Sequence, residues 1–303
     1  MRVHVVGNVC VDTTFRLDRF PAAGETLNAS SHADGLGGKG ANQAVAAART
    51  GADVRFHAAI GNDAAGAWIR EQLGRDLDAS HLTMLPLPSD RSTIMVDARG
   101  ENLIVTGASC AIAFDPLADS GFIRSVEHGD IVVMQGNLSP EITTACLSAA
   151  RDVGAVTIFN PSPLAADYAP ILSDVSVAIV NAGEAEQVTG ASDPAPAARE
   201  LIRRGAGAAI VTLGAGGCLV ADGQGRIDRI AAPRVAVLDT SGAGDVFCGC
   251  LAGCLAAGMD LATAARIAVR AAAISVGRAG TLGSCPDRRE MKMLMETTEA
   301  ETA

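Results

Sequence analysis

The stretch Asp239-Thr240-Ser241-Gly242-Ala243-Gly244-Asp245 stands directly before an apolar run of small residues that extends to Ala257. Its two glycines let the backbone turn sharply and let a ligand approach the main chain. The pattern predicts a tight loop that opens a buried helix, whose first N–H groups and dipole suit an anion such as phosphate. Asp245 falls in that first turn, where its carboxylate could take a proton from the acceptor of a phosphoryl group. A carboxylate that only stabilises the helix N-terminus explains the residue equally well.

The composition indicates a globular protein with a large aliphatic core. The chain has 303 residues, enough for one large α/β domain or two modest ones. Hydrophobic residues make up 49% and aromatic residues only 3%, so Ala, Val, Leu and Ile must fill the core. The formal net charge of −10 argues against binding to nucleic acids or to anionic membranes. An anionic substrate stays compatible with that charge, because helix N-termini and a few cations can hold it locally.

The sequence lacks the marks of a secreted or membrane protein. No run reaches the roughly 18 apolar residues of a membrane span, and Met1–Gly7 turns polar too soon for a signal peptide. We therefore expect the eight cysteines to be reduced thiols in a cytoplasm. Cys248, Cys250 and Cys254 lie on an apolar helix without a nearby His, and only the last two share a face, which predicts buried core thiols rather than metal ligands.

Short apolar runs typical of buried strands alternate with helical patterns along most of the chain. The main predicted strands are Val3–Val6, Val54–Ile60, Ile131–Met134, Val156–Phe159, Val177–Val180 and Ala209–Thr212. Two long helices are predicted near Ala243–Ala257 and Leu261–Val276. This alternation predicts an α/β fold, a doubly wound and mostly parallel sheet flanked by helices, with ligands at the carboxyl ends of the strands.

We expect residues 1–303 to form a single domain, because no linker or low-complexity stretch divides the chain. Polar, loosely alternating residues near Glu25–Asp34 and a hairpin of Thr93–Val96 with Leu103–Val105 predict a small additional sheet. Its strands would be inserted from about residues 13–36 and 90–107.

The glycine-rich segment Gly35-Leu36-Gly37-Gly38-Lys39-Gly40 matches the spacing of a dinucleotide-binding fingerprint. That fingerprint must follow a buried strand, whereas this segment follows the polar stretch Asn28–Asp34. A phosphate-binding P-loop also fails, because glycine rather than Ser or Thr follows Lys39. What remains is a flexible turn that presents Lys39 and Asn42 at a helix start, where their polar groups suit a polyhydroxylated ligand. A helix-capping loop with a solvated lysine is the alternative.

Two further stretches follow predicted strands directly. Asn181-Ala182-Gly183-Glu184 places an amide and a carboxylate at a strand's carboxyl end, where they could hold a hydrated Mg²⁺. A helix cap with a carboxylate in the first turn accounts for the same residues. The loop Thr212–Gly217 could line a nucleotide site.

Together these stretches resemble the ribokinase-like family of carbohydrate kinases, and within it the ribokinases most closely. The resemblance rests on Gly37-Gly38-Lys39-Gly40-Ala41-Asn42-Gln43-Ala44 in the first half and on Asp239–Asp245 in the second. Asn181-x-x-Glu184 and the loop Thr212–Gly217 stand between them in the expected order. The similarity covers essentially the whole chain.

The resemblance implies a kinase that transfers the γ-phosphoryl group of ATP to a hydroxymethyl group of a sugar, with D-ribose as the first expectation. It implies a β-sheet lid through which two copies form a homodimer. Asp245 would be the general base, and the amides of Gly242, Ala243 and Gly244 would form the anion hole. The sugar contacts would be Asp12, Gly38, Lys39, Asn42 and Asn137. The contacts to ATP and to the Mg²⁺–phosphate region would be Asn181, Glu184, Thr212, Gly214 and Gly217. A monovalent cation such as K⁺ would bind near Asp239 and Ser241, with Gly280 and Ser284 completing the site.

Some positions depart from the family pattern and leave the acceptor open. Cys10 stands where Asn is usual and Asn137 where Glu is usual, and the resemblance implies that both positions belong to the sugar pocket. Another pentose, a ketohexose or a nucleoside is therefore the alternative acceptor. A phosphorylated sugar would need cations near the lid, for which only Arg91 and Arg99 are available. A non-catalytic sugar- or nucleotide-binding regulator is a further alternative, but such a protein would not need Asp245.

Overall fold

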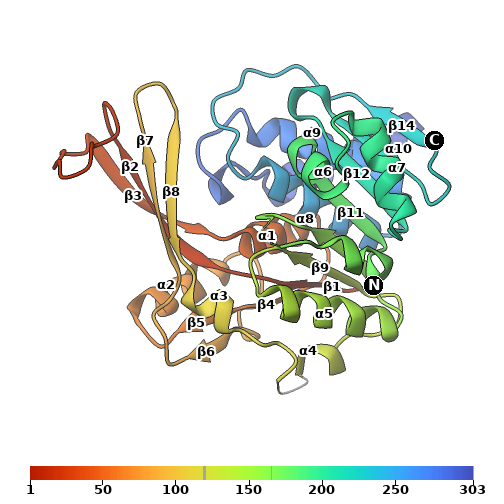
Figure 1. The fold of residues 1–303 in the computed structure, drawn as a ribbon, viewed down its shortest axis with the longest axis horizontal. Coiled ribbons are helices and arrows are strands. Elements are labelled where there is room, and N and C mark those ends of the chain that lie inside the picture. The colour runs from red at the N-terminus through yellow and green to blue at the C-terminus, as the bar shows by residue number, and fades with distance from the viewer. Residues whose placement is uncertain (119–120, 165, 303) are drawn as a thin grey trace.

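The structure, a computed structural model, describes residues 1–118, 121–164 and 166–302. A central eight-stranded sheet organises it (Figure 1). From one edge to the other the strands are β14 (Ile227–Ile230), β13 (Cys218–Ala221), β12 (Ala208–Thr212), β11 (Val177–Asn181), β10 (Val156–Asn160), β9 (Ile131–Gln135), β1 (Val3–Val6) and β4 (Val54–His57). The six strands from β12 to β4 are parallel and only the β14–β13–β12 edge is antiparallel, which confirms the predicted fold class.

Helices cover both faces of this sheet because its strands are apolar on both sides. On β1, for example, Val5 packs into one core and Val6 into the other. The first face carries α1 (Lys39–Arg49), α8 (Ala243–Ala256) and α9 (Leu261–Ser275). The second carries α5 (Pro140–Asp152), α6 (Ala182–Thr189) and α7 (Pro194–Arg203). The remaining elements are α2 (Ala64–Leu73), α3 (Ser109–Ala113), α4 (Gly121–Arg124), α10 (Arg288–Thr302) and three short 3₁₀ turns, η1 (Ala169–Asp174), η2 (Gly214–Gly216) and η3 (Leu282–Ser284).

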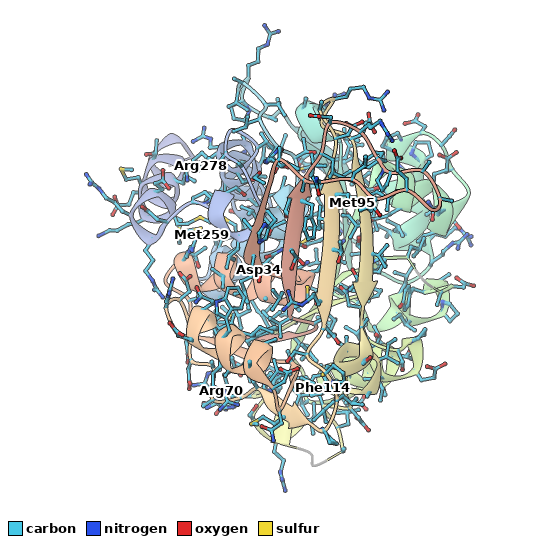
Figure 2. The ribbon with its side chains drawn as sticks, turned by 90° about the vertical axis from the view of Figure 1, so that its left-hand side faces the viewer. Asp34, Arg70, Met95, Phe114, Met259 and Arg278 are labelled. Carbon is cyan, nitrogen blue, oxygen red and sulfur yellow. The ribbon has the colours of Figure 1, made fainter. Side chains whose placement is uncertain are left out.

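A separate four-stranded sheet stands beside the main body, at the left of Figure 1. Its order is β3 (Ser31–Gly37), β2 (Cys10–Arg16), β7 (Arg91–Val96) and β8 (Asn102–Gly107). Side chains alternate between its two faces. Figure 2 looks onto the outer face, with Asp34 and Met95 labelled. Asp12, Ser92 and Thr106 share the inner face, since they pair in register across β2, β7 and β8.

The strand boundaries of this separate sheet differ from the expected ones. Strand β2 was not expected, because Cys10–Arg16 mixes apolar, polar and charged residues without clear alternation. Strand β3 begins later than expected and contains Gly35 and Gly37. The glycine-rich segment therefore continues an edge strand of the small sheet, not a buried parallel strand, which agrees with the rejection of a dinucleotide fingerprint. The predicted strand Val54–Ile60 is two strands, β4 and β5 (Ala59–Gly61), and β5 pairs with β6 (Thr83–Leu85).

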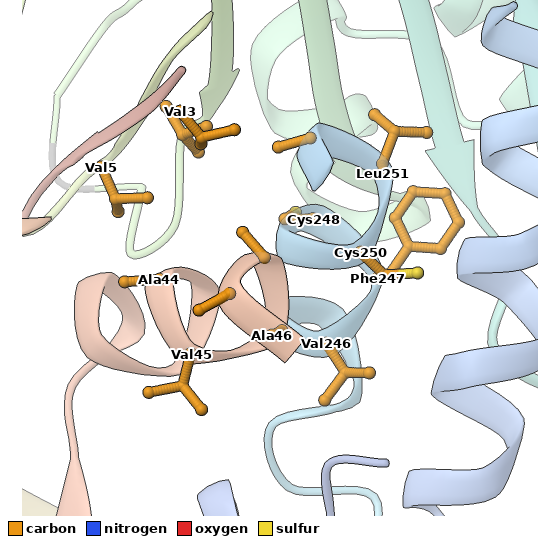
Figure 3. Packing of buried hydrophobic residues seen from close by; sticks show 14 of the residues in the cluster. Val3, Val5, Ala44, Val45, Ala46, Val246, Phe247, Cys248, Cys250 and Leu251 are labelled. Carbon is orange, nitrogen blue, oxygen red and sulfur yellow. The ribbon is translucent and has the colours of Figure 1, made fainter. Parts of the chain in front are cut away.

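Helices α1 and α8 cross closely beneath the sheet (Figure 3). Small residues make this approach feasible: a Cβ placed on Gly249 of α8 would lie 2.2 Å from the carbonyl oxygen of Gln43 and 2.7 Å from the Cβ of Ala46 on α1. The Ala- and Gly-rich composition of both helices thus brings their first turns together.

The described cysteines are all free thiols and all buried, including the three on α8. Burial raises the pKa of Cys248 well above its ordinary value. Within the described ranges, no group of three or more His, Cys, Asp or Glu residues is arranged to hold a metal ion. No helix in the described part of the chain is both long and apolar enough to cross a membrane.

Candidate active site

An open cavity of about 230 Å³ lies at the carboxyl edge of the parallel sheet. Parallel strands end together at this edge, so the residues that follow them converge. The cavity brings together seven residues singled out from the sequence: Lys39, Asn181, Glu184, Thr212, Gly242, Gly244 and Asp245. They come from α1, α6, α8 and the ends of β11 and β12.

The start of α8 forms one wall of the cavity. Gly242 is the N-cap residue in the left-handed conformation, with φ of 76°, which L-residues with side chains rarely adopt. The first-turn N–H groups of a helix have no carbonyl partner within it and so are available to an anion. The amide of Ala243 already donates a long hydrogen bond to the carbonyl oxygen of Thr240, at 3.4 Å. In this conformation it is therefore less available to an anion than the sequence suggested.

The carboxylate of Asp245 is held by α1 on both of its oxygens. Nδ2 of Asn42 donates to Oδ2 at 3.0 Å, and Nε2 of Gln43 donates to Oδ1 at 3.0 Å. Asp245 is only 5% exposed, so these two bonds replace water for a buried anion. The arrangement leaves further lone pairs on each oxygen for a proton donor.

Helix α1 begins at the glycine-rich turn. Gly38 is its N-cap with φ of 96°, and a Cβ there would lie 2.8 Å from the backbone of Asn8 and of Val9. This close packing fixes where α1 starts, and thereby where Lys39 enters the cavity. Oδ1 of Asn42 is buried and has no hydrogen-bond partner among the described residues, so it is an acceptor without a donor.

Asn181 and Glu184 form a reciprocal capping box at the start of α6. Oδ1 of Asn181 accepts from the amide of Glu184 at 2.8 Å, and Oε2 of Glu184 accepts from the amide of Asn181 at 2.9 Å. The helix-cap interpretation is therefore correct, and both residues also line the cavity. The second carboxylate oxygen of Glu184 is not used by this cap.

The loop after β12 divides into parts with different surroundings. Thr212 lines the cavity, and its hydroxyl donates to the carbonyl of Val180 at 3.4 Å. Gly214 has open space beside it. Gly217 does not, because a Cβ there would lie 1.9 Å from the carbonyl oxygen of Ile230 on β14. The packing of β14 is thus sufficient to explain a glycine at position 217.

Asp12 approaches the site from the inner face of the small sheet. Its carboxylate lies against Gly37, and Oδ1 accepts from the thiol of Cys10 at 3.1 Å. Burial, and then the charge of Asp245, raise the pKa of Asp12. Asn137 lies two residues beyond β9 and is not among the residues that line the cavity, within the part of the chain described. Its Oδ1 is buried without a partner there.

Two of the residues predicted to hold a monovalent cation, Ser241 and Gly280, contact Asp239. Its two carboxylate oxygens accept from the amides of Ser241 and Gly280, each at 2.9 Å. Burial acts to raise the pKa of Asp239, but these amide bonds outweigh it and hold that pKa below its ordinary value. Ser284 is fully buried, and its hydroxyl donates to the carbonyl of Thr281 at 2.7 Å.

Several polar residues at the site were not predicted to belong to it. They are Gln43, which binds Asp245, and three that line the cavity: Asn160, Ser162 and Thr240. Cys248, expected only as a core thiol, lines the cavity as well. Asn160 ends β10 as Asn181 ends β11, so a polar residue closing a buried strand is the signal that could have found it. Gln43 carried a signal too, as a polar residue within an Ala-rich buried helix.

Comparison with known proteins gives one consistent family. The profile described as pfkB family carbohydrate kinase matches residues 2–288. A ribokinase of Mus musculus is 32% identical over 306 residues, covering 97% of this chain and 94% of its own length. A deoxyribokinase of Salmonella typhi is 30% identical over 314 residues, covering 99% of this chain and all of its own. The crystal structure of a ribokinase from Thermotoga maritima superposes with a TM-score of 0.90 at 29% identity, over 97% of this chain and 99% of that one.

The family profile therefore extends over both halves of the site, from the α1 start to the α8 start. These two curated relatives match over 94% and 100% of their own length and not through a shared fragment. The chain belongs to the pfkB family of carbohydrate kinases, which are phosphotransferases with an alcohol group as acceptor.

Proposed function

We propose that this protein transfers the γ-phosphoryl group of ATP to a hydroxymethyl group of a sugar, with D-ribose as the first candidate. The observation that carries the proposal is Asp245, whose carboxylate lies in the first turn of α8 at the cavity wall, bound on both oxygens by amides of α1. A base and an anion-binding helix start are thereby within the same few residues.

In the proposed step, the oxygen of the sugar hydroxyl forms a bond to the γ-phosphorus. The bond between that phosphorus and the oxygen bridging it to the β-phosphate breaks, and ADP leaves with the electron pair. The hydroxyl proton passes to the carboxylate of Asp245. The amides of Gly242 and Gly244 and the ammonium of Lys39 stabilise the charge on the transferring group, which is the main catalytic requirement of phosphoryl transfer.

The residues around the cavity fit a nucleotide with its magnesium ion. Glu184 keeps one carboxylate oxygen outside the capping box, and oxygen ligands with several retained waters are what Mg²⁺ prefers. We propose that Glu184 and Asn181 would hold the Mg²⁺–phosphate region, and that Thr212 and Gly214 would contact the nucleotide. When bound, Mg²⁺ would supply positive charge against the phosphates.

The sugar side favours an unphosphorylated acceptor. Arg91 binds the hydroxyl of Thr13 on the outer face of the small sheet, and Arg99 binds Asp97 in the hairpin. Arg91 thus lies on the face opposite to Asp12, and Arg99 is paired with its neighbour Asp97, so we expect neither guanidinium to hold a sugar phosphate. Asp12 and the unpartnered Oδ1 of Asn42 offer acceptors for sugar hydroxyls. Deoxyribose is the second candidate, because a ribokinase and a deoxyribokinase are similar to this chain at nearly equal identity, 32% and 30%.

Three finer features complete the proposal. K⁺ would bind beside Asp239 and accelerate the reaction, so equal rates in K⁺, Na⁺ and a bulky organic cation would contradict a cation site there.

The small sheet would act as a lid and as a homodimer interface. Eight free thiols suit a reducing compartment such as the cytoplasm.

The direct test is release of ADP from ATP and Mg²⁺ across a panel of D-ribose, 2-deoxyribose, other pentoses, ketohexoses and nucleosides. We expect release to depend on a sugar, with ribose or deoxyribose giving the highest kcat/KM. If the rate of ADP release were the same with and without each acceptor, the proposal of a sugar kinase would be overturned.

A further inference from the structure

A chain of buried amide side chains leads from the central sheet to Asp245. Gln43 is fully buried, and its Nε2 donates to Oδ1 of Asp245 at 3.0 Å. Gln135, at the end of β9 and 1% exposed, donates from its own Nε2 to Oε1 of Gln43 at 2.8 Å. None of the interactions assigned above to the sugar or the nucleotide involves either glutamine.

Both neighbours of Gln43 favour the same orientation of its amide. A glutamine amide has an acceptor end and a donor end that are nearly equal in shape. A carboxylate only accepts hydrogen bonds, so Asp245 requires the NH₂ end of Gln43, and Gln135 holds that orientation by donating to the oxygen end. Oε1 of Gln135 is buried and has no hydrogen-bond partner among the described residues.

The hydrogen bond from Gln43 restricts the carboxylate of Asp245 in a way that the bond from Asn42 alone does not. Asn42 alone would hold Oδ2 and leave the carboxylate free to rotate about that contact. The Gln43 bond on Oδ1 fixes the plane of the carboxylate, and thus the direction of its remaining lone pairs. A base must meet its proton within a narrow range of distance and angle, so a fixed plane favours transfer.

We infer that Gln43 and Gln135 are positioning residues for Asp245, with Gln135 holding the oxygen end of the Gln43 amide and Gln43 setting the plane of the base. Asn160 accepts a longer bond from the same Nε2 of Gln43, at 3.4 Å, and its own Nδ2 donates to the carbonyl of Ile179 at 2.9 Å. This inference rests on the proposed function, because it assigns the residues to the base of that reaction.

The charged groups around Asp245 are left unchanged by the variants that follow. They are Lys39 at the start of α1, Glu184 at the start of α6 and Asp12 on β2. Changes in kcat among these variants therefore report the lost amide bonds and not a changed field of charges.

The kinetic test uses Gln43→Met and Gln135→Met, which keep the length and volume of the side chain but remove its hydrogen bonds. We expect Gln43→Met to lower kcat by about 10- to 100-fold, part of the roughly 10²–10⁴-fold that a positioned base contributes. The KM values for sugar and ATP should stay within about twofold.

A double variant separates orientation from packing. If Gln135 acts through Gln43, Gln135→Met should lower kcat in the wild-type background and have no further effect in the Gln43→Met background. Equal losses in the two backgrounds would overturn the relay. The matched control is Thr157→Val, which removes a buried hydroxyl bond at the opposite end of β10. It should lower stability without moving kcat.

A readout without turnover separates failure of this inference from failure of the proposed function. The carboxyl ¹³C resonance of Asp245, identified by its absence in Asp245→Asn, should have the same chemical shift at pH 7.5 in wild type and Thr157→Val and a different one in both glutamine variants, because the bond to Oδ1 is lost or displaced. An unmoved resonance, or a wild-type kcat in Gln43→Met, would overturn the relay. Sugar-independent ADP release with a moved resonance would instead overturn the sugar-kinase proposal and leave the relay standing.

Discussion

Nδ2 of Asn42 lies 3.0 Å from Oδ2 of Asp245, although 203 positions separate the two residues in the chain. The bond joins the first turn of α1 to the first turn of α8. Each helix start has a glycine N-cap with positive φ, Gly38 for α1 and Gly242 for α8. Two loops that are remote in sequence thus become one site because the helices behind them cross closely.

Asn42→Leu removes the donor to Asp245 and the unpartnered acceptor Oδ1 while keeping most of the volume. We expect it to lower kcat and also to raise the KM for sugar, because Asn42 is placed to serve both base and acceptor. Steady-state kinetics with sugar and ATP varied separately provide the measurement. The contrast with Gln43→Met, which should change kcat alone, is the control; a raised KM for ATP only would contradict this assignment.

Gly249→Ala should weaken the α1–α8 contact. Replacing glycine by alanine within a helix ordinarily stabilises by up to about 1 kcal/mol. Here the new methyl group meets the backbone oxygen of Gln43 at 2.2 Å, so we expect a loss of about 1–3 kcal/mol together with a lower kcat. Denaturant unfolding measures the first effect and ADP release the second.

Gly183→Ala on α6 is the matched control for stability, since its new Cβ has only an ordinary contact, 3.4 Å from Oδ1 of Asn181. It should be neutral or stabilising. If Gly249→Ala behaved in the same way, the close helix crossing would not be a constraint.

A histidine pair makes stability depend on pH. His4 and His57 lie between the sheet and Phe122, with Nδ1 of His4 and Nε2 of His57 3.2 Å apart. Burial lowers the pKa of His4 from 6.5 to about 4, against the opposing effect of Asp130, and lowers that of His57 from 6.5 to about 3, helped by the neighbouring His4. Both folded-state pKa values lie below the unfolded value. The contribution of the neutral histidines to folding stability is therefore complete above about pH 6.5 and is lost as the pH falls toward 4 and 3.

We expect the free energy of unfolding to fall in that window by up to about 1.4 kcal/mol per pH unit for each histidine. In His57→Phe the free energy of unfolding should depend less steeply on pH, as measured by urea unfolding from pH 7.5 to 4.5. His128→Gln, at an exposed position, should keep the wild-type slope. A wild-type slope in His57→Phe as well would assign the acid sensitivity to other groups.

The outer face of the small sheet, on which Figure 2 labels Met95, carries a cross-strand row of Phe15, Met95 and Leu103, with Val105 beside it by the register of the strands. Leu103 is 43% and Val105 62% exposed, which is unusual for neighbouring apolar side chains on an edge strand. We expect wild type to be a dimer through this face. Val105→Lys should shift it to monomer in light scattering without loss of folded structure.

Ile104→Lys is the matched control for the dimer prediction. Ile104 is on the same strand and is 53% exposed, but it belongs to the inner face with Thr106. It should remain dimeric even if activity falls. A monomeric wild type, or dissociation of the Ile104 variant alone, would place the interface elsewhere.

The sequence predicted the central fold well because its strands are continuous apolar runs separated by clear helices. It also showed the capping-box spacing of Asn181 and Glu184, which is a local property. Strand β2 was missed because its pairing with β3 and β7, and not its own composition, makes it a strand. The bond from Gln43 to Asp245 could not be predicted from the sequence, because it joins residues 202 positions apart and depends on how α1 and α8 cross.

The central claim is that Asp245 acts as the general base, and Asp245→Asn tests it most directly. The amide keeps the shape of the side chain but cannot accept the hydroxyl proton as a carboxylate does. We measure sugar-dependent ADP release and, separately, the dissociation constant for ATP. We expect turnover to fall by about 10²–10⁴-fold or more while the ATP dissociation constant stays within about twofold. Turnover near the wild-type rate would contradict the account.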